Sequence, residues 1–484
     1  MKRITALLVA LQLALLASCS DGGKPTDVQT SADTGPDTSS PTEEKDRLDE
    51  LGAKDFGGRT FRILDANSYP SVHVNMPGES MNGDIVNDAL YERDMAISDR
   101  YNINIKYEQA DHATTGCNTL KKSVLAGDDA YSLCISCING GALEKIAVEG
   151  VLANLSDNPY ISLEAEWWSR LIYENLNLDG RMFFTMGDIS PTMYQTASCM
   201  YLNTALAEDY GVSVDEICAL VRNGKWTLDA VGGYTKDLSR DMNDDGVMSV
   251  DNDFFGLINS NTSLDVIACC AGVKTSELSA DKKNIIVDML NDSTLKVIDK
   301  VRDITIPKIK YSDQVEIITK AFKEGRALML YQLTEGTQLL RDMEDDYLLL
   351  PAPKGSEAQS DYHSYVNSWA NAYIAIPETS DPEFAGFITE ALDFWSYKYT
   401  RPKAYDLTYK QKTARDENSA GMLDIIFDTL CIDFNYIKDF GGSYNALKKV
   451  LDGKGELASE MDSLRSKIDS DIEKYVSGWK TAGN

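Results

Sequence analysis

The feature that most limits the fold is the alternation of strand and helix patterns over residues 60–138. Three short apolar runs are typical of strands: residues 60–64 (TFRIL), 103–107 (INIKY) and 130–138 (AYSLCISCI). Between the first two runs, residues 84–101 carry apolar side chains near helical spacing, and a second helix is expected before the third. The order strand, helix, strand, helix, strand predicts an α/β lobe with a mainly parallel sheet.

One such lobe does not account for the whole chain. At 484 residues the chain is too long for one ordinary core, and its 43% of apolar residues is enough to bury two or three. Two further helices, at residues 380–395 and 457–476, each carry their apolar side chains on one stripe. The first of them is expected to begin at Ser380-Asp381-Pro382, a cap followed by a proline.

The charge of the chain limits its partners. Lys and Arg number 47 and Asp and Glu number 76, so the formal net charge is −29. Phosphates would be repelled by such a surface, which argues against a nucleic-acid partner and against adsorption of the folded part to anionic lipid.

The first residues have the pattern of an export signal. Lys2 and Arg3 precede an apolar run over residues 7–17, which is too short to span a bilayer. The run ends in Leu-Ala-Ser-Cys19, which resembles the lipobox of bacterial lipoproteins. We therefore expect a lipoprotein signal peptide over residues 1–18 and a lipid on Cys19. The alternative is an ordinary signal peptide followed by a cysteine by chance.

The segment after Cys19 is expected to be a tether. Residues 20–49 are rich in Ser, Thr, Asp, Gly and Pro and almost lack apolar side chains, so they cannot offset the entropy lost on folding. Residues 19–54 are thus interpreted as the lipidated cysteine and a flexible linker. The predicted location is the outward face of the cell membrane, with the lipid as the only membrane contact.

Eight cysteines remain after Cys19, and an even number in an exported chain permits disulfides. Cys134 and Cys137 lie in a strand pattern, however, and Cys269 is adjacent to Cys270, so pairing within either set is geometrically awkward. Buried free thiols are the preferred interpretation. The alternative is a redox or zinc site at Cys134 and Cys137, but no second CxxC motif and no histidine cluster accompanies them in the sequence.

Several segments in order carry a family resemblance over about residues 55–480. They are GGRTFRIL, MNGDIVNDALYERD, GDDAYSLCISCINGGALEKIAVEGVLANL, EWWSRL, MYLNTAL, GKWTLD, AFKEGRALMLYQ, DDYLLLPAPKGSEAQSDYHSY and AYIAIPETSDPEFAGFITEAL. Together with the lipobox, their order resembles the extracellular solute-binding lipoproteins of carbohydrate ABC transporters, the maltose-binding-protein-like class. The segment from Arg415-Asp416 to residues 422–426 (MLDII) resembles the large acidic lipoproteins of gut anaerobes in that class.

The resemblance implies an α/β, two-lobed periplasmic-binding-protein-like fold, with hinge strands and a ligand cleft between the lobes. Crossings are expected near residues 187–198, 327–331 and 369–376. Lobe one would comprise residues 55–190 plus 328–370, and lobe two residues 191–327 plus 371–484.

The implied function is capture of a sugar or oligosaccharide by cleft closure, followed by delivery to the permease subunits of an importer. We expect a monomer without enzymatic activity or organic cofactor. The three histidines, His73, His112 and His363, are isolated in the sequence, and no HExxH, GxSxG or P-loop motif is present. A surface glycan-binding lipoprotein not coupled to import and a lipid-anchored carbohydrate-active hydrolase remain as alternatives.

Sugars bind to aromatic faces and to planar polar side chains, and the chain has 24 Tyr and 6 Trp against 3 His. Trp167 and Trp168 are adjacent, so at least one is expected to be exposed. Parallel sheets bind ligands beyond the carboxyl ends of their strands, which favours residues at strand ends and crossings. The predicted ligand-binding set is Trp168, Asp188, Asn139, Tyr194, Tyr331, Gln332 and Trp369. Arg415 and Asp416 are interpreted as either an ion pair or a ligand clamp.

An acidic loop over residues 241–256 (DMNDDGVMSVDNDFFG) follows a helix expected over residues 227–240. Its spacing matches a calcium loop with oxygen ligands at positions 1, 3, 5, 7 and 9 and a glycine at position 6. Position 12 is Asn252, and a one-residue bulge would bring in Asp253 instead. The predicted ligands for a structural Ca²⁺ are Asp241, Asn243, Asp245, Val247 through its carbonyl, Ser249 and Asp253. The alternative is a solvated acidic turn.

Overall fold

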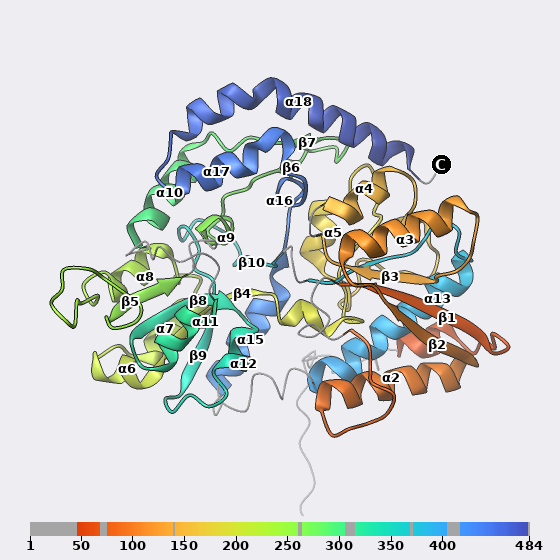
Figure 1. Ribbon diagram of the computed structural model, residues 1–484, viewed down its shortest axis with the longest axis horizontal. Helices are drawn as coiled ribbons and strands as arrows, with labels where there is room; N and C mark the ends of the chain where they lie inside the picture. The colour runs from red at the N-terminus through yellow and green to blue at the C-terminus, as the bar shows by residue number, and fades with distance from the viewer. Residues whose placement is uncertain are drawn as a thin grey trace, which may run out of the picture. The chain divides into compact units, whose positions relative to one another are not determined.

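Two four-stranded sheets organise the folded chain (Figure 1). The computed structural model describes residues 46–67, 75–138, 141–259, 264–304, 315–367, 371–403 and 417–482, with side chains of the last range described from residue 421. The signal peptide, Cys19 and residues 20–45 of the expected tether lie outside these residues, as do His73, Asn139, Trp369, Arg415 and Asp416. The flexible linker was expected to extend to residue 54, but residues 47–51 form a helix that packs on the helix over residues 382–395, because Leu48 is buried there. None of the described helices is both long and apolar enough to cross a membrane.

The first sheet has the strand order β11-β3-β1-β2. Its strands are β1 (Arg59–Ala66), β2 (Ile103–Gln109), β3 (Leu133–Ser136) and β11 (Tyr373–Ala375). β1 pairs in parallel with both β2 and β3, and only β11 runs antiparallel to its neighbour. This confirms the mainly parallel sheet predicted from residues 60–138.

Helices surround this first sheet: α1 (Arg47–Leu51), α2 (Ile85–Tyr101), α3 (Ala113–Leu125), α4 (Ala142–Val148), α5 (Arg170–Leu176) and α13 (Pro382–Trp395). α2 begins where the Asp84 side chain accepts a hydrogen bond from the backbone N–H of Asn87, and it ends at Asn102 in the left-handed conformation. α13 begins at the expected cap, since the Asp381 carboxylate accepts from two backbone N–H groups before Pro382 enters the first turn.

The second sheet has the order β5-β8-β4-β9. Its strands are β4 (Ser198–Asn203), β5 (Phe255–Asn259), β8 (Ala327–Leu333) and β9 (Tyr347–Pro351). β8 lies between β4 and β5, and all but the last of its residues are buried, as expected for a strand covered on both faces.

Most of the remaining helices lie around the second sheet: α6 (Thr204–Asp209), α7 (Val214–Arg222), α8 (Leu228–Thr235), α9 (Leu264–Cys270), α10 (Asp292–Ile304), α11 (Val315–Lys323), α12 (Gly336–Leu339), α15 (Glu417–Asp428), α16 (Phe434–Lys438) and α17 (Ser443–Leu451). Short pairs are formed by β6 (Glu277–Leu278) with β7 (Ile285–Ile286), and by β10 (Ser364–Tyr365) with β12 (Leu430–Cys431). Single-turn elements are η2 (Leu155–Asp157), η3 (Pro191–Tyr194), η5 (Ser396–Thr400) and η6 (Phe440–Gly442).

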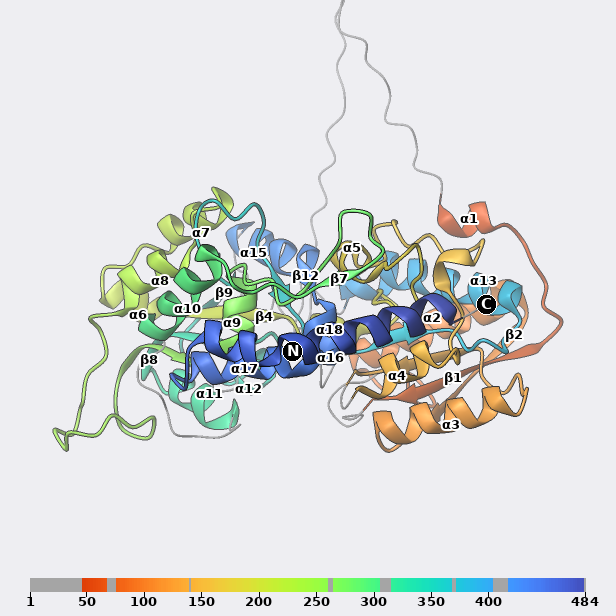
Figure 2. The same cartoon turned by 90° about the horizontal axis from the view of Figure 1, so that it is seen from above.

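The last helix joins the two halves. α18 (Leu457–Thr481) packs on α17 beside the second sheet and on α4 beside the first, and Figures 1 and 2 both show it lying along these helices. Near its end Trp479 is fully buried, and its indole nitrogen donates to the backbone oxygen of Arg181. This helix therefore couples the stability of the two halves.

Strand pairing changes the expected lobe boundaries. Residues 328–370 were expected in lobe one, but β8 and β9 pair within the second sheet. Residues 371–484 were expected in lobe two, but β11 pairs with β3 and α13 packs on α2 in the first half. The expected crossing at residues 327–331 is thus wrong, because those residues form a central strand.

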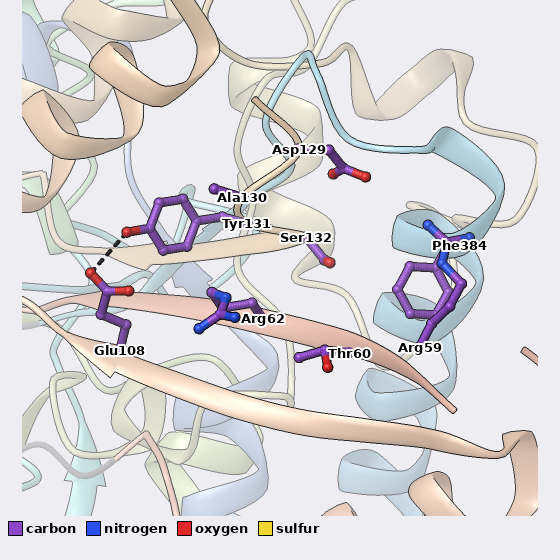
Figure 3. A pocket seen from close by; sticks show the side chains of 9 residues that line it. All are labelled: Arg59, Thr60, Arg62, Glu108, Asp129, Ala130, Tyr131, Ser132 and Phe384. Atoms are coloured by element: carbon purple, nitrogen blue, oxygen red, sulfur yellow. Dashed lines mark hydrogen bonds between the residues drawn. The ribbon is translucent and has the colours of Figure 1, made fainter. Parts of the chain in front are cut away.

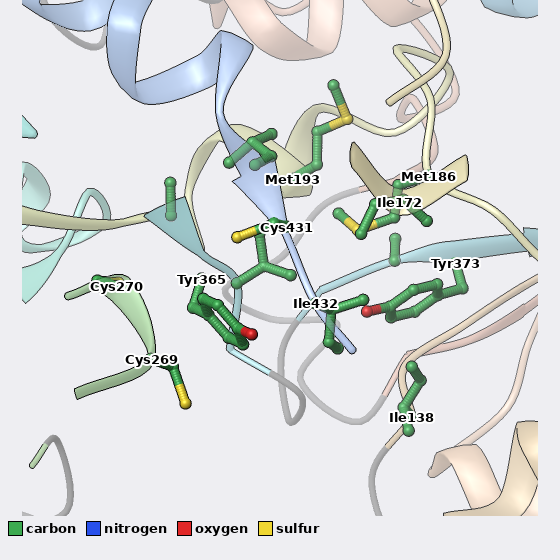
Figure 4. Close-up of a cluster of buried hydrophobic side chains, with 14 of the residues drawn as sticks. Ile138, Ile172, Met186, Met193, Cys269, Cys270, Tyr365, Tyr373, Cys431 and Ile432 are labelled. Carbon is green, nitrogen blue, oxygen red and sulfur yellow. The ribbon is translucent and has the colours of Figure 1, made fainter. Parts of the chain in front are cut away.

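Apolar packing is continuous between the halves, and it contains cysteines. Cys431 and Ile432 lie among side chains such as Tyr365, Met193 and Ile172 (Figure 4). All eight cysteines after Cys19 are buried free thiols, which is the interpretation preferred from their positions in the sequence.

Candidate functional site

The segment over residues 185–197 carries the chain from the first sheet to the second. Thr185 forms a bridge with Ile374 of β11, and Ala197 forms a bridge with Val366 just before β4 begins. Between them lies the single turn η3, whose first residue is Pro191 and whose Ser190 side chain accepts from the Thr192 N–H. This is the first of the expected crossings, and the structure confirms its place.

Two other stretches link the halves. One runs from Val366, beside β4, to β11, and so corresponds to the crossing expected near residues 369–376. The other leads from α13 and η5 on the first half to α15, which packs on β9 and α7. It takes the place of the crossing that was expected at residues 327–331.

Polar side chains collect where the first crossing meets the strand ends, and we call them the crossing cluster. They are Asp65, Asn75, Thr185, Asp188, Ser190, Thr192, Tyr194, Gln195, Gln332, Asn371 and Arg401. Asp65 closes β1, Gln332 lies near the end of β8, and Asn371 precedes β11. The cluster thus has members from both halves of the chain.

Asp188 is a buried charged group of the cluster, with 2% exposure. The Tyr194 hydroxyl donates to its Oδ1, and Arg401 Nη1 lies 3.7 Å from its Oδ2. The Arg401 guanidinium also lies 5.3 Å from the centre of the Tyr194 ring. Burial raises the pKa of Asp188 to about 7, although the Arg401 charge opposes this. Asp188 and Tyr194 were both predicted from the sequence, and the structure brings them into contact.

A second acid lies at the end of β1. Asp65 is buried, and burial raises its pKa to about 6, while hydrogen bonds from Asn75 and from the Asn67 backbone oppose that rise. Asn75 in turn accepts through Oδ1 from the Ser190 hydroxyl on the crossing segment. The chain of contacts therefore fixes the crossing segment to the carboxyl end of the parallel sheet, where such folds bind ligands.

Several buried polar atoms of the cluster have no hydrogen-bond partner among the described residues. They are Thr185 Oγ1, Asp188 Oδ2, Gln195 Oε1, Gln332 Nε2 and Asn371 Oδ1. Such atoms are uncommon because each costs about 1–3 kcal/mol when left unsatisfied. These atoms lie on the first crossing segment and on strands β8 and β11 or next to them, and buried polar atoms left unsatisfied on such segments point to a polar ligand.

The remaining predicted residues have other surroundings. Trp168 is 3% exposed, and its indole nitrogen donates to Glu390 Oε2 at 3.0 Å, which are the contacts of a core residue. Trp167 is the more exposed of the two and packs edge-to-face on Phe394. Tyr331 is buried with its hydroxyl 3.5 Å from Cys270 Sγ, and burial raises its pKa well above the usual range.

The acidic loop lies between α8 and β5, with Arg240 and Phe254 paired across its base. Asp241 Oδ2 accepts from the Gly246 N–H at 2.7 Å, and Gly246 has the positive φ that the tight turn requires. Asp253 is buried and accepts from the N–H groups of Met242 and Ser249. In the described part of the chain, no three acidic, His or Cys side chains are grouped as metal ligands would be.

The sequence did not reveal the roles of Arg401, Asp65 or Asn75. Asp393 could have been found from the sequence. It is a carboxylate within the apolar run ALDFW of α13, and a charged group is unusual on the buried stripe of a helix. It is fully buried, accepts from the Ile189 N–H at 2.5 Å on the crossing segment, and burial raises its pKa well above the usual range.

Two α/β halves with crossing segments between them define the two-lobed fold of the maltose-binding-protein-like solute-binding proteins, as the resemblance implied. Solved structures of that class match along most of the chain, although the sequences are far apart. No family model and no curated protein matches the sequence.

Three solved structures illustrate the likeness. UgpB from Mycobacterium tuberculosis in complex with glycerophosphocholine is 13% identical, with a TM-score of 0.53, over 87% of this chain and 99% of that one. The galacto-N-biose/lacto-N-biose I-binding protein of Bifidobacterium longum, in complex with lacto-N-biose, is 12% identical, with a TM-score of 0.52, over 87% and 99%. A cyclo/maltodextrin-binding protein with maltotetraose is 12% identical, with a TM-score of 0.52, over 87% and 97%.

Proposed function

We propose that this chain is the solute-binding component of an ABC importer and that it captures a sugar or oligosaccharide at the crossing cluster. The observation that carries the proposal is a set of buried polar atoms, on segments from both halves, that have no hydrogen-bond partner among the described residues. Sugar hydroxyls both donate and accept hydrogen bonds, so they suit carbonyl, amide and carboxyl groups alike. The neighbouring ring of Tyr194 adds an aromatic surface.

The arrangement also suits capture by closure. A ligand favours a closed state only through contacts that the open state lacks, and contacts to both lobes meet that condition. Asp188 and Tyr194 are on the crossing segment itself, whereas Tyr331 and Gln332 belong to the second sheet. Asn139 and Trp369 stay predictions from the sequence.

The ligands of the similar structures support a sugar as the first choice of solute. Maltotetraose and lacto-N-biose are carbohydrates, while glycerophosphocholine is a small phosphodiester with a glycerol hydroxyl end. The described helices contain no membrane span, and we propose that Cys19 carries the lipid that holds a monomeric binding domain outside the cell, beside its permease. Radiolabelled palmitate should enter the wild-type chain in a bacterial host and not the Cys19→Ser variant.

A titration and a turnover assay together test the proposal. Residues 46–484 are titrated calorimetrically with common mono- and oligosaccharides, and each mixture is assayed for newly formed reducing ends. Saturable binding of a free sugar without release of product supports the binding protein. Release of sugar from an oligosaccharide would support the lipid-anchored hydrolase instead, and binding of polymers alone would support a surface glycan-binding protein.

We further propose that the acidic loop binds a structural Ca²⁺ through the oxygens of Asp241, Asn243, Asp245, Val247, Ser249 and Asp253. Asp241 Oδ1 fits this, because it is buried and has no hydrogen-bond partner among the described residues. A bound cation would screen carboxylates that otherwise repel one another, and would thereby hold α8 to β5. Chelation should lower the melting temperature, and added Ca²⁺ should restore it, without changing sugar affinity in the folded protein. An unchanged melting temperature would contradict the proposal.

A further inference from the structure

The contact between α4 and α18 contains a buried acid. Glu144 on α4 is 4% exposed, and its Oε2 has no hydrogen-bond partner among the described residues. Tyr475 on α18 is equally buried and lies within the electrostatic reach of Glu144, and its hydroxyl has no such partner either. We propose that this contact is a proton-dependent latch: it keeps the end of α18 on the first half while Glu144 is protonated, and it releases that end when Glu144 ionises.

The two ends of α18 are held by different halves of the fold. Near its beginning, Glu460 pairs with Lys449 of α17, beside the second sheet. At its end, the Trp479 indole nitrogen donates to the backbone oxygen of Arg181, and Arg181 Nη1 donates to the backbone oxygen of Ala482 at 2.7 Å. Release of the end from α4 would therefore leave the beginning of the helix attached to the second half.

The packing around Glu144 leaves little room for water. A Cβ at Gly478 of α18 would lie 3.1 Å from Val148 Cβ of α4, so the two helices approach closely. Both α3 and α18 pack on α4. Of the two, α3 also packs on β1 and β3, whereas the main other contacts of α18 are with α17 and η6 beside the second sheet. Hydration of the Glu144 carboxylate is therefore achieved most easily by moving the end of α18.

The charged and titratable groups that act on Glu144, or on which Glu144 acts, come from four helices. They are Lys145 on α4, Lys438 on α16, Tyr475 on α18 and Cys117 on α3. Burial raises the pKa of Glu144 to about 7, and the Lys438 charge and the backbone N–H groups of Lys145 and Glu144 oppose that rise. The docked state therefore keeps a proton that a hydrated carboxyl group, with its ordinary pKa of 4.5, would lose.

Another Glu–Tyr pair shows how solvent changes such a contact. Beside the groove of about 380 Å³ on the first sheet, the Tyr131 hydroxyl donates to the exposed Glu108 carboxylate at 2.8 Å (Figure 3). Water reaches that carboxylate, so its charge is solvated. Glu144 is enclosed, and an ionised carboxylate there would lose its water without gaining a hydrogen bond from Tyr475.

Hydrogen exchange on residues 46–484 tests the latch through backbone protection factors, which are corrected for the intrinsic effect of pH. Between pH 5 and pH 8, protection of residues 472–482 should fall by about 30-fold or more, because opening is favoured once the exposed acid ionises. Protection of residues 457–464 should change less. Glu144→Gln stays neutral and should abolish the fall. The exposed Glu473 on α18 provides the matched control, and Glu473→Gln should behave as the wild type does.

Equal protection of residues 472–482 at pH 5 and pH 8 would overturn the proposal, as would the same fall in Glu144→Gln. An equal fall along the whole of α18 would also overturn it, because that result indicates a global loss of stability. Urea unfolding shows whether Glu144→Gln is folded. If it is not, the wild-type profile decides, since protection should fall from about pH 5 and level off above about pH 7. No sugar enters this test, so the latch and the proposed function can fail independently.

Discussion

Asp188 should make the stability of the protein depend on pH in a way that one substitution removes. Burial raises its pKa from the ordinary value of 3.8 to about 7 in the folded state. The folded protein therefore holds a proton on Asp188 between about pH 4 and pH 7 that the unfolded chain has lost. The free energy of unfolding must fall as the pH rises through that window.

The size of the effect follows from the pKa difference. A difference of one in pKa corresponds to about 1.4 kcal/mol. The free energy of unfolding should therefore fall by about 4 kcal/mol between pH 4 and pH 8 because of Asp188. Asp188→Asn cannot titrate, and its carbonyl oxygen can still accept from the Tyr194 hydroxyl. The difference in unfolding free energy, variant minus wild type, should therefore rise by about 4 kcal/mol over that range.

Urea unfolding followed by circular dichroism at each pH measures the difference. Titrating groups that do not interact with Asp188, Asp65 among them, cancel in the subtraction. Asp393 does not cancel fully, because the Asp188 charge contributes to the rise of its pKa. The exposed Asp462 on α18 is the matched control, and the difference for Asp462→Asn should stay flat. A flat difference for Asp188→Asn as well would refute the reasoning, since it would mean that Asp188 is charged in the folded protein at all these pH values.

Four further predictions concern glycine positions and buried side chains. A Cβ on Gly187 would lie 2.5 Å from Asp393 Oδ2, so Gly187→Ala should cost about 1–3 kcal/mol in urea unfolding. Gly233→Ala, in α8 with open space around it, should instead gain about 0.5–1 kcal/mol. Trp168→Phe should lose about 1–3 kcal/mol, because Glu390 loses a buried donor, and should leave sugar affinity unchanged; weaker sugar binding would return Trp168 to the ligand site. The eight buried thiols should react with a thiol reagent only on unfolding, and fast reaction of the native protein would contradict their burial.

Local patterns predicted the first half of the fold well. The strand expected at residues 103–107 is β2 (Ile103–Gln109), and the helix expected at residues 84–101 is α2 (Ile85–Tyr101). These elements alternate apolar and polar side chains or carry clear caps, so their own residues determine their type. The helix expected over residues 227–240 is shorter, ending at Thr235, because the two adjacent glycines weaken its last turns.

The lobe assignment failed where the answer depends on distant residues. The sequence ALMLYQL of β8 is apolar on both faces, and a hinge strand and a central strand of a sheet look the same in that respect. Only its pairing with β4, more than a hundred residues away, distinguishes them. Sequence separation also explains the outcome at the site. Asp188 and Tyr194 are six residues apart and could both be predicted from one segment, whereas Arg401 reaches them from a distant part of the chain.

The crossing cluster as the solute site is the central claim, and the affinity of the Gln332→Ala variant tests it most directly. The sugar that binds wild-type residues 46–484 most tightly is titrated into this variant and into Asn284→Ala, an exposed amide in the turn between β6 and β7. Loss of the Gln332 amide should raise the dissociation constant by about ten-fold or more, while Asn284→Ala leaves it unchanged. Wild-type affinity in a folded Gln332→Ala protein would contradict the claim.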